Sequence, residues 1–514
     1  MKMVKSLLLG SAATLIAVAG AQAADLPVKA KAVEYVKVCS LYGAGFYYIP
    51  GTDTCIKIGG FVRVDYLWNG NGSVSPDIQG ANGRYTRADT ADTQTRGRVM
   101  SSWDVRTQTE YGTLRSFARW GMQGTSGGGT AGTSSAGTLN ATHTSDFVID
   151  RIMIQFAGFT FGRAQSFADF SAPHGNGTYG FFSDTGGGAP QVLAYTAQLG
   201  NGLALTVAAE DGSFRRTPLI DADAVAAQTV SIIGAGQVSN YMGQNIPDFV
   251  ASLRLDQAWG SAQISGAIHQ VAAAYYGATD NTSTAVALGT KPGDKWGWNI
   301  GGGLSLNVPT GPGDQLTLEG RYSEGATHYS GGNFVSGGMY GNGGAAGTLG
   351  TLGLGYASDG VFAANTTAIN AAFGGGTHDG SIELTTSWSA YASFQHFWTP
   401  ALRSSIFGGI FAVDYGGRAN ALLCSTMEAS AAAAFSNISG CDFDYKVYQV
   451  GTRTIWSPVA NLDLSIDVFY SKLDQQHVSN LTVTAQGARP AGVYTLEDQD
   501  TWTVLFRAQR NFWY

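Results

Sequence analysis

The chain has 514 residues, with 30 Lys and Arg against 37 Asp and Glu, which gives a formal net charge of −7. This mildly acidic balance argues against a nucleic-acid partner, which would require a basic face. After residue 23 no apolar run is as long as a transmembrane helix. The chain is therefore either soluble or crosses a membrane as strands, and only a closed barrel pairs every backbone group of membrane strands.

The first 23 residues predict a secretory signal peptide. A basic start over residues 1–5 precedes an apolar run over residues 6–20 and the small-x-small cleavage site Ala21-Gln22-Ala23. The run is too short to span a bilayer comfortably, which disfavours a membrane anchor. Removal of Lys2 and Lys5 leaves 28 basic against 37 acidic residues, so the mature charge is −9.

Residues 24–54 differ from the rest of the chain and are interpreted as an N-terminal extension that enters or caps the main fold. Two of the four cysteines, Cys39 and Cys55, lie at its end, and Cys424 and Cys441 form a second local pair. An even number of cysteines in an exported chain favours disulfides within these pairs. Zinc is the alternative, but no second close pair or histidine motif accompanies either pair.

Segments of alternating character recur from residue 56 to the end. In residues 56–66, Ile58 and Val64 share one face, while Lys57 and Arg63 share the other. Side chains alternate across a strand, so this pattern predicts a two-faced β-strand. A half-buried sheet of a soluble protein would show the same alternation.

The connections between these segments distinguish the alternatives. Short turns near 112, 158, 201–202, 259–260, 309–314, 399–400 and 457–461 alternate with long loops near 69–95, 123–146, 166–190, 212–247, 272–294, 325–382, 416–443 and 475–497. Eight long loops and seven short turns imply about sixteen strands, an even number that is typical of bacterial outer-membrane barrels. We therefore predict an all-β, antiparallel transmembrane β-barrel over residues 55–514, with long extracellular loops and short periplasmic turns.

The last segment, residues 499–514, is the clearest strand. Trp502, Val504 and Phe506 share one face, and Thr503 and Arg507 share the other. Aromatic residues near strand ends suit the membrane boundary.

Three further segments carry a family resemblance. They are residues 24–27 (ADLP) with 38–60 (VCSLYGAGFYYIPGTDTCIKIGG), residues 159–166 (FTFGRAQS), and residues 449–453 (QVGTR) with 456–459 (WSPV). On these residues the chain resembles the general porins of alphaproteobacteria, of the rhizobial type, over essentially the whole mature sequence. It departs from them at its end, because porins more often end in Phe and this chain ends in Tyr514.

The resemblance implies a sixteen-stranded barrel in the outer membrane of a Gram-negative cell, in contact with lipid and lipopolysaccharide. It implies a homotrimer with loop 3, residues 166–190, folded into the lumen. The implied function is passive diffusion of small hydrophilic solutes and ions, without a cofactor.

Basic residues spaced evenly within the strands are predicted to line the pore, because even spacing keeps side chains on one face. These residues are Lys57, Arg63, Arg98, Arg106, Arg115 and Arg119, and Arg163 opens loop 3. Asp169 and Asp184 supply the opposing acids from that loop. Charges at a constriction set ion preference, although the same residues could merely line a wide wet lumen. The mature charge of −9 favours a weak preference for cations.

Three alternatives stay open: a substrate-selective channel for sugars or carboxylates on the same barrel, an exported soluble β adhesin, and a barrel enzyme. The seven histidines are scattered and form no H-E-x-x-H motif, and no G-x-S-x-G nucleophile elbow occurs. We therefore expect neither an enzyme nor a metal site.

Overall fold

The computed structural model describes residues 37–68, 93–126, 143–170, 189–222, 241–276, 291–331, 339–343, 350–363, 380–430, 435–483 and 492–512. The predicted signal peptide (residues 1–23), Asp184 and the terminal Tyr514 lie outside these ranges. None of the helices within them is long and apolar enough to cross a membrane.

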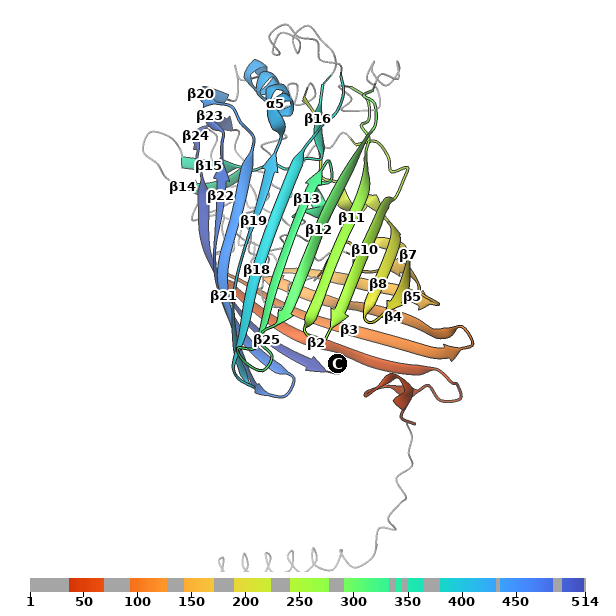
Figure 1. Ribbon diagram of the computed structural model, residues 1–514. Coiled ribbons are helices and arrows are strands. Elements are labelled where there is room, and N and C mark those ends of the chain that lie inside the picture. The colour runs from red at the N-terminus through yellow and green to blue at the C-terminus, as the bar shows by residue number, and fades with distance from the viewer. Residues whose placement is uncertain are drawn as a thin grey trace, which may run out of the picture.

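Within the described ranges, sixteen antiparallel strands close into a barrel (Figure 1). Each strand pairs with the next one along the chain, and β2 pairs with β25 to close the ring, for example at Arg63 opposite Gln509. The strands in order around the barrel are β2 (Cys55–Trp68), β3 (Thr93–Thr109), β4 (Gly112–Ser126), β5 (His143–Phe156), β6 (Phe159–Arg163), β7 (Gln191–Gly200), β8 (Leu203–Glu210), β10 (Asp248–Gln257), β11 (Gly260–Val271), β12 (Lys295–Asn307), β13 (Gln315–Glu324), β18 (Thr386–Thr399), β19 (Leu402–Asp414), β21 (Tyr445–Val459), β22 (Leu462–Gln475) and β25 (Gln499–Phe512). The predicted barrel is confirmed.

The connections alternate in length as the sequence predicts. The strand bounds leave two residues in each short turn except 308–314, whereas every connection at the opposite end is longer, from 127–142 to 325–385. In the β7–β8 turn, Asn201 and Gly202 have φ angles of 49° and 75°, the left-handed pair that a two-residue hairpin turn favours. A Cβ atom at Gly202 would also lie 2.0 Å from the carbonyl oxygen of Asp256, so only glycine fits there.

The two faces of the barrel wall differ in polarity. On β11, Ile264 and Ile268 face outward and are half exposed, whereas Gln263, Ser265 and His269 face inward and are buried. The outward rows also carry the large aromatic residues Trp68, Trp103, Trp296, Trp298, Trp398, Trp456 and Trp502. An apolar outer band and a polar interior are the arrangement expected of a barrel in lipid.

The N-terminal extension, described from residue 37, packs at the short-turn end of the barrel (Figure 1). Its strand β1 (Tyr47–Tyr48) pairs with the start of β2, and a disulfide joins Cys39 to Cys55. Phe46 is buried beside this disulfide, and its ring lies 5.0 Å from the guanidinium carbon of Arg106 on β3. The extension therefore covers the inward face of the first barrel strands at this end.

The long loops carry structure of their own, which the sequence pattern did not predict. One small sheet combines β14 (Met339–Gly343), β15 (Gly350–Leu354), β20 (Phe435–Gly440), β23 (Val478–Val483) and β24 (Gly492–Leu496), and another combines β9 (Leu219–Asp221), β16 (Gly360–Phe362) and β17 (Glu383–Leu384). A helix, α5 (Gly416–Ser430), is tied to the chain before β21 by the disulfide Cys424–Cys441. Both predicted cysteine pairs are therefore confirmed.

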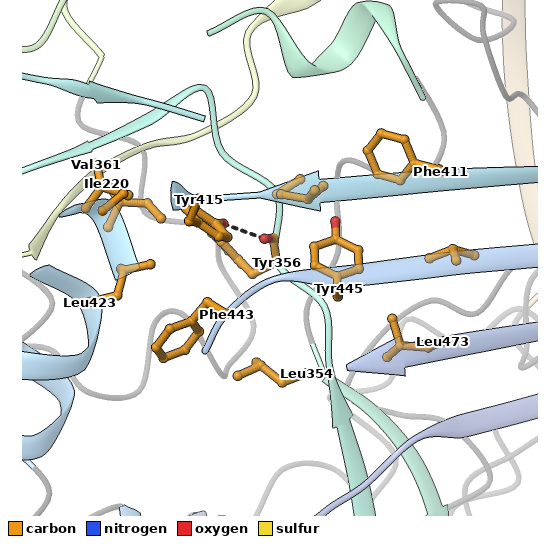
Figure 2. Packing of buried hydrophobic residues seen from close by; sticks show 14 of the residues in the cluster. Ile220, Leu354, Tyr356, Val361, Phe411, Tyr415, Leu423, Phe443, Tyr445 and Leu473 are labelled. Atoms are coloured by element: carbon orange, nitrogen blue, oxygen red, sulfur yellow. Dashed lines mark hydrogen bonds between the residues drawn. The ribbon is translucent and has the colours of Figure 1, made fainter. Parts of the chain in front are cut away.

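An apolar core joins these loops to one wall of the barrel (Figure 2). Phe411, Tyr445 and Leu473 face inward from β19, β21 and β22, and pack with loop residues such as Leu354 and Val361 in a single buried cluster. Within it, the Tyr415 hydroxyl donates a hydrogen bond to the carbonyl of Tyr356. The upper part of this wall is therefore covered by packed side chains.

Candidate pore constriction

Six of the predicted basic residues lie on inward rows of β2, β3 and β4, and the register sets guanidinium groups opposite one another. Arg63 faces Arg98 across β2 and β3, and Arg106 faces Arg115 across β3 and β4. Like charges directly opposite each other destabilise a sheet. The neighbouring side chains must therefore compensate for this repulsion.

Shared carboxylates supply part of this compensation. The Asp104 Oδ1 atom accepts from Arg106 Nε at 2.9 Å and from Arg115 Nε at 3.0 Å. Asp65, which is fully buried, accepts from Arg96 Nε at 3.0 Å and from Arg507 Nε at 2.6 Å. One negative charge thus lies between two positive charges in each case. Asp65, Arg96 and Arg507 are site residues that the sequence analysis left out, although their even spacing from Arg63, Arg98 and Gln509 could have found them.

A third shared carboxylate depends on a β-bulge in β5. Arg119 pairs with Arg151 and Trp120 with Ile149, so Asp150 is an extra residue in the ladder. A bulge of this kind places two successive residues against one. Asp150 forms ion pairs with both Arg119 and Arg151, and Ile149 and Ile152 on either side remain exposed on the outer face.

Loop 3 begins directly beside this bulge. Arg151 donates to the side-chain oxygen of Gln165, and the Gln165 amide donates to the Asp169 carboxylate. Asp169 is buried. The structure therefore brings the predicted loop acid Asp169 into one hydrogen-bonded chain with Arg151 of β5, through residues that the sequence analysis did not single out.

The same loop is fixed on the far wall through its backbone. The Ala168 carbonyl accepts from Arg321 Nη2 on β13 and from Ser265 Oγ on β11, both at 2.6 Å. The carbonyl of Phe170 accepts from Arg254 Nη1 on β10 at 3.1 Å. Residues 164–170, which lead from β6 into loop 3, therefore run inside the barrel to β10–β13, which confirms the inward fold of this segment.

Arg163 is placed differently from the other predicted basic residues. It pairs with Ile152 and Gln191, which lie in outward rows, and its guanidinium carbon lies 6.0 Å from the ring of Phe214. The register therefore separates Arg163 from the inward rows that carry the other six predicted basic residues.

A cavity of about 540 Å³, with mainly polar residues around it, lies between the start of loop 3 and the wall of β7, β8, β10 and β11. Its lining includes Gln165, Asp169, Gln198, Arg254, Asp256 and Gln263. Side chains of this kind hydrogen-bond to water and to polar solutes. In the part of the chain that the structure describes, no group of three or more His, Cys, Asp or Glu residues could hold a metal ion.

Comparisons with known proteins agree with this architecture. The chain is 32% identical over 262 residues to porin Omp2b of Brucella canis, which covers 50% of this chain and 64% of that protein, and 33% identical over 269 residues to porin Omp2b of Brucella suis, with the same coverage. The matches thus span less than two thirds of these relatives. The outer membrane channel DcaP of Acinetobacter baumannii shares the fold, with a TM-score of 0.53 at 15% identity over 90% of this chain and 99% of that one. The porin subfamily profile matches residues 25–505, so the chain belongs to this subfamily and is an outer-membrane β-barrel protein.

Proposed function

We propose that the protein forms a water-filled channel through which small hydrophilic solutes and ions diffuse passively across the outer membrane. One observation carries this proposal: residues 164–170, at the start of loop 3, run inside a closed barrel, linked to β5 through Arg151 and Gln165 and to the far wall through Arg321. A loop held at both walls narrows the lumen without closing it. Solutes would pass between Asp169 on the loop and the arginines on the wall.

The transverse field is the selective element of this channel. Lys57, Arg63, Arg98, Arg106, Arg115 and Arg119 supply its positive side, and Asp169 supplies the negative side, with Asp184 as a second acid in the same loop. Fixed charges facing each other across a wet pore orient polar solutes and disfavour apolar ones. We expect no enzymatic activity from the chain.

We propose a homotrimer as the working assembly. The outward rows are apolar along the barrel, so they suit both a neighbouring barrel and the lipid and lipopolysaccharide of the outer membrane. Extraction of the protein from outer membranes as a heat-modifiable trimer would support this assembly, and recovery of a monomer alone would contradict it.

Liposome swelling with a series of sugars, amino acids and carboxylates tests the diffusion function. For a general channel, the swelling rate should fall smoothly with solute size. A sharp preference for one solute class would instead favour the substrate-selective channel. Absence of both swelling and stepwise single-channel conductance would rule out a channel.

A further inference from the structure

The positive charge of the barrel interior is concentrated on one wall. On β25, β2, β3, β4 and β5, nine basic side chains in the described part of the chain face inward, against four acidic ones. The basic residues are Lys57, Arg63, Arg96, Arg98, Arg106, Arg115, Arg119, Arg151 and Arg507, and the acidic residues are Asp65, Asp104, Asp146 and Asp150. We call these thirteen residues the basic wall. It has an excess of five positive charges.

The other walls carry no such excess. On β18, β19, β21 and β22, the inward charges described are balanced, with Arg403 and Arg453 facing Asp463 and Asp467. On β8 and β10–β13, three basic and four acidic side chains point inward. The basic ones are Arg254, Lys295 and Arg321, and the acidic ones are Glu210, Asp248, Asp256 and Glu319. An ion in the lumen therefore meets one strongly positive surface and no comparable negative one on the barrel wall.

The acidic residues within the basic wall cannot cancel this charge, because three of them are shared. Asp65, Asp104 and Asp150 each pair with two guanidinium groups. Each of these triads keeps a net charge of +1. The carboxylates already make short contacts to their arginines, so they hold the wall together and leave the excess charge facing the lumen.

Arg63 and Arg98 lie directly opposite each other in the register of β2 and β3. Arg63 Nε donates to Gln509 Oε1 at 2.7 Å, and Arg98 Nε donates to Gln123 Oε1 at 2.9 Å. The charges acting on Arg63 include those of Arg96, Arg98 and Arg507 against the single carboxylate of Asp65. An amide oxygen orients a guanidinium group without neutralising it. This pair therefore places two positive charges side by side on the inward face of the basic wall.

We infer that the basic wall makes the channel prefer anions, with small carboxylates, phosphate and chloride as the favoured class and Arg63 and Arg98 as the residues that determine the preference. This inference rests on the proposed function, since it concerns the same pore. Rings of Arg and Lys select anions in water-filled pores, because fixed positive charge raises the local anion concentration. The net charge of −7 for the whole chain does not determine the ion preference of the pore, because charges farther away than about 8 Å are screened at physiological salt.

The reversal potential across a planar bilayer with a KCl gradient at neutral pH tests this inference. Wild-type channels are expected to be more permeable to chloride than to potassium, and this preference should weaken as the salt concentration rises. The double variant Arg63→Gln/Arg98→Gln should lower the chloride-to-potassium permeability ratio about twofold or more, because two of the five excess charges are removed. The double variant Arg63→Lys/Arg98→Lys, which keeps the charge, should retain the wild-type ratio.

Arg510→Gln is the matched control. Arg510 lies on β25, three residues after Arg507, but it pairs with Val62 in an outward row, so its loss should leave the permeability ratio unchanged. A wild-type channel that prefers potassium would overturn the inference, and so would a ratio that the double glutamine variant does not change. In both cases stepwise conductance would persist, so the proposed channel function would stand. Absence of conductance in the wild type would overturn both.

Discussion

The imidazole Nδ1 atom of His269 lies 2.8 Å from the Oδ1 atom of Asp248, and this buried pair joins neighbouring strands β11 and β10 to two long loops. On its other edge, His269 Nε2 lies 3.3 Å from the hydroxyl of Tyr241, which donates to Asp359 at 2.8 Å. The hydroxyl of Tyr329 donates to the second oxygen of Asp248 at 2.7 Å. Hydrogen bonds to His269 and to its partner Asp248 therefore hold loops 211–247 and 325–385 against the barrel wall.

Replacement of His269 tests this junction. His269→Ala would leave the carboxylates of Asp248 and Asp359 buried beside each other without the imidazole between them, and loss of one partner from a buried charged pair costs about 3–5 kcal/mol. We expect faster proteolysis of the two loops and a lower temperature of heat-modifiability. His396→Ala is the control, because His396 contacts Asp314 at the short-turn end and is partly exposed. Equal loop protection in both variants would contradict the role of His269.

Arg321 should set the width of the constriction. Arg321→Ala removes one of the donors to the Ala168 carbonyl, which keeps those from Ser265 and Gln263, and it removes the 2.6 Å bond from Arg321 Nη1 to Asn299 Oδ1. A buried acceptor that loses its donor, as Asn299 Oδ1 does, costs about 1–3 kcal/mol. Loop 3 should then leave the far wall for part of the time. Single-channel recordings should show noisier current and a larger mean conductance than wild type.

Arg403→Ala provides the comparison for Arg321. Arg403 also faces the lumen, but the contacts described for it are with Phe397, Ser457 and Asp463, and none of them involves loop 3. This variant should change conductance only slightly and add no current noise. If both variants are equally noisy, the general loss of lumen charge, and not the release of loop 3, explains the effect.

The disulfide Cys424–Cys441 should stabilise the extracellular loops but not the barrel. It spans 17 positions and ties α5 to the segment before β21, and a disulfide that closes a loop of this size typically contributes about 2–4 kcal/mol. Cys424→Ser/Cys441→Ser should make the α5 segment sensitive to protease while the barrel retains its heat-modifiability. The matched variant Cys39→Ser/Cys55→Ser, at the opposite end, should leave α5 protected.

The sequence alone predicted the features that follow from the alternation of side chains along a β-strand. Alternation along β2 and β25, together with the alternating loop lengths, gave the strand number, the turns and the inward face of Arg63 and Arg98. It could not predict the packed wall on β19, where Ile406, Phe407, Ile410 and Phe411 are all apolar. Both faces of that strand are covered, one by lipid and one by loops, so alternation is lost.

The sequence alone also could not predict the contacts between loop 3 and the barrel wall. Ala168 and Arg321 are 153 residues apart, and no local pattern relates a backbone carbonyl to a distant guanidinium group. The bulge in β5 breaks the alternation at Asp150, the carboxylate that pairs with Arg119 and Arg151. Both features arise when the chain closes on itself, because the partners meet only in the finished barrel.

Acid should reduce the stabilising contribution of His477 to the packing of the extracellular loops. This imidazole is buried against the ring of Phe443, with centroids 4.8 Å apart, and its burial lowers the pKa of His477 from 6.5 to about 4, despite the attraction of Asp442. The folded loops therefore favour the neutral form, so its stabilising contribution is complete above pH 6.5 and is lost as the pH falls through about 4.

Two carboxyl groups in the same loops act in the opposite direction. Burial raises the pKa of Asp444 and that of Asp359 to about 6, so their contribution is complete below pH 3.8 and is lost as the pH rises through about 6. Between pH 4 and pH 6 these two carboxyl groups outweigh the one histidine, so protease protection of the loops should fall as the pH rises from 4 to 6 and change little from there to pH 8. His477→Leu removes the opposing titration of the histidine, so it should make this fall steeper. If the variant shows the same fall as wild type, His477 does not contribute to the pH response.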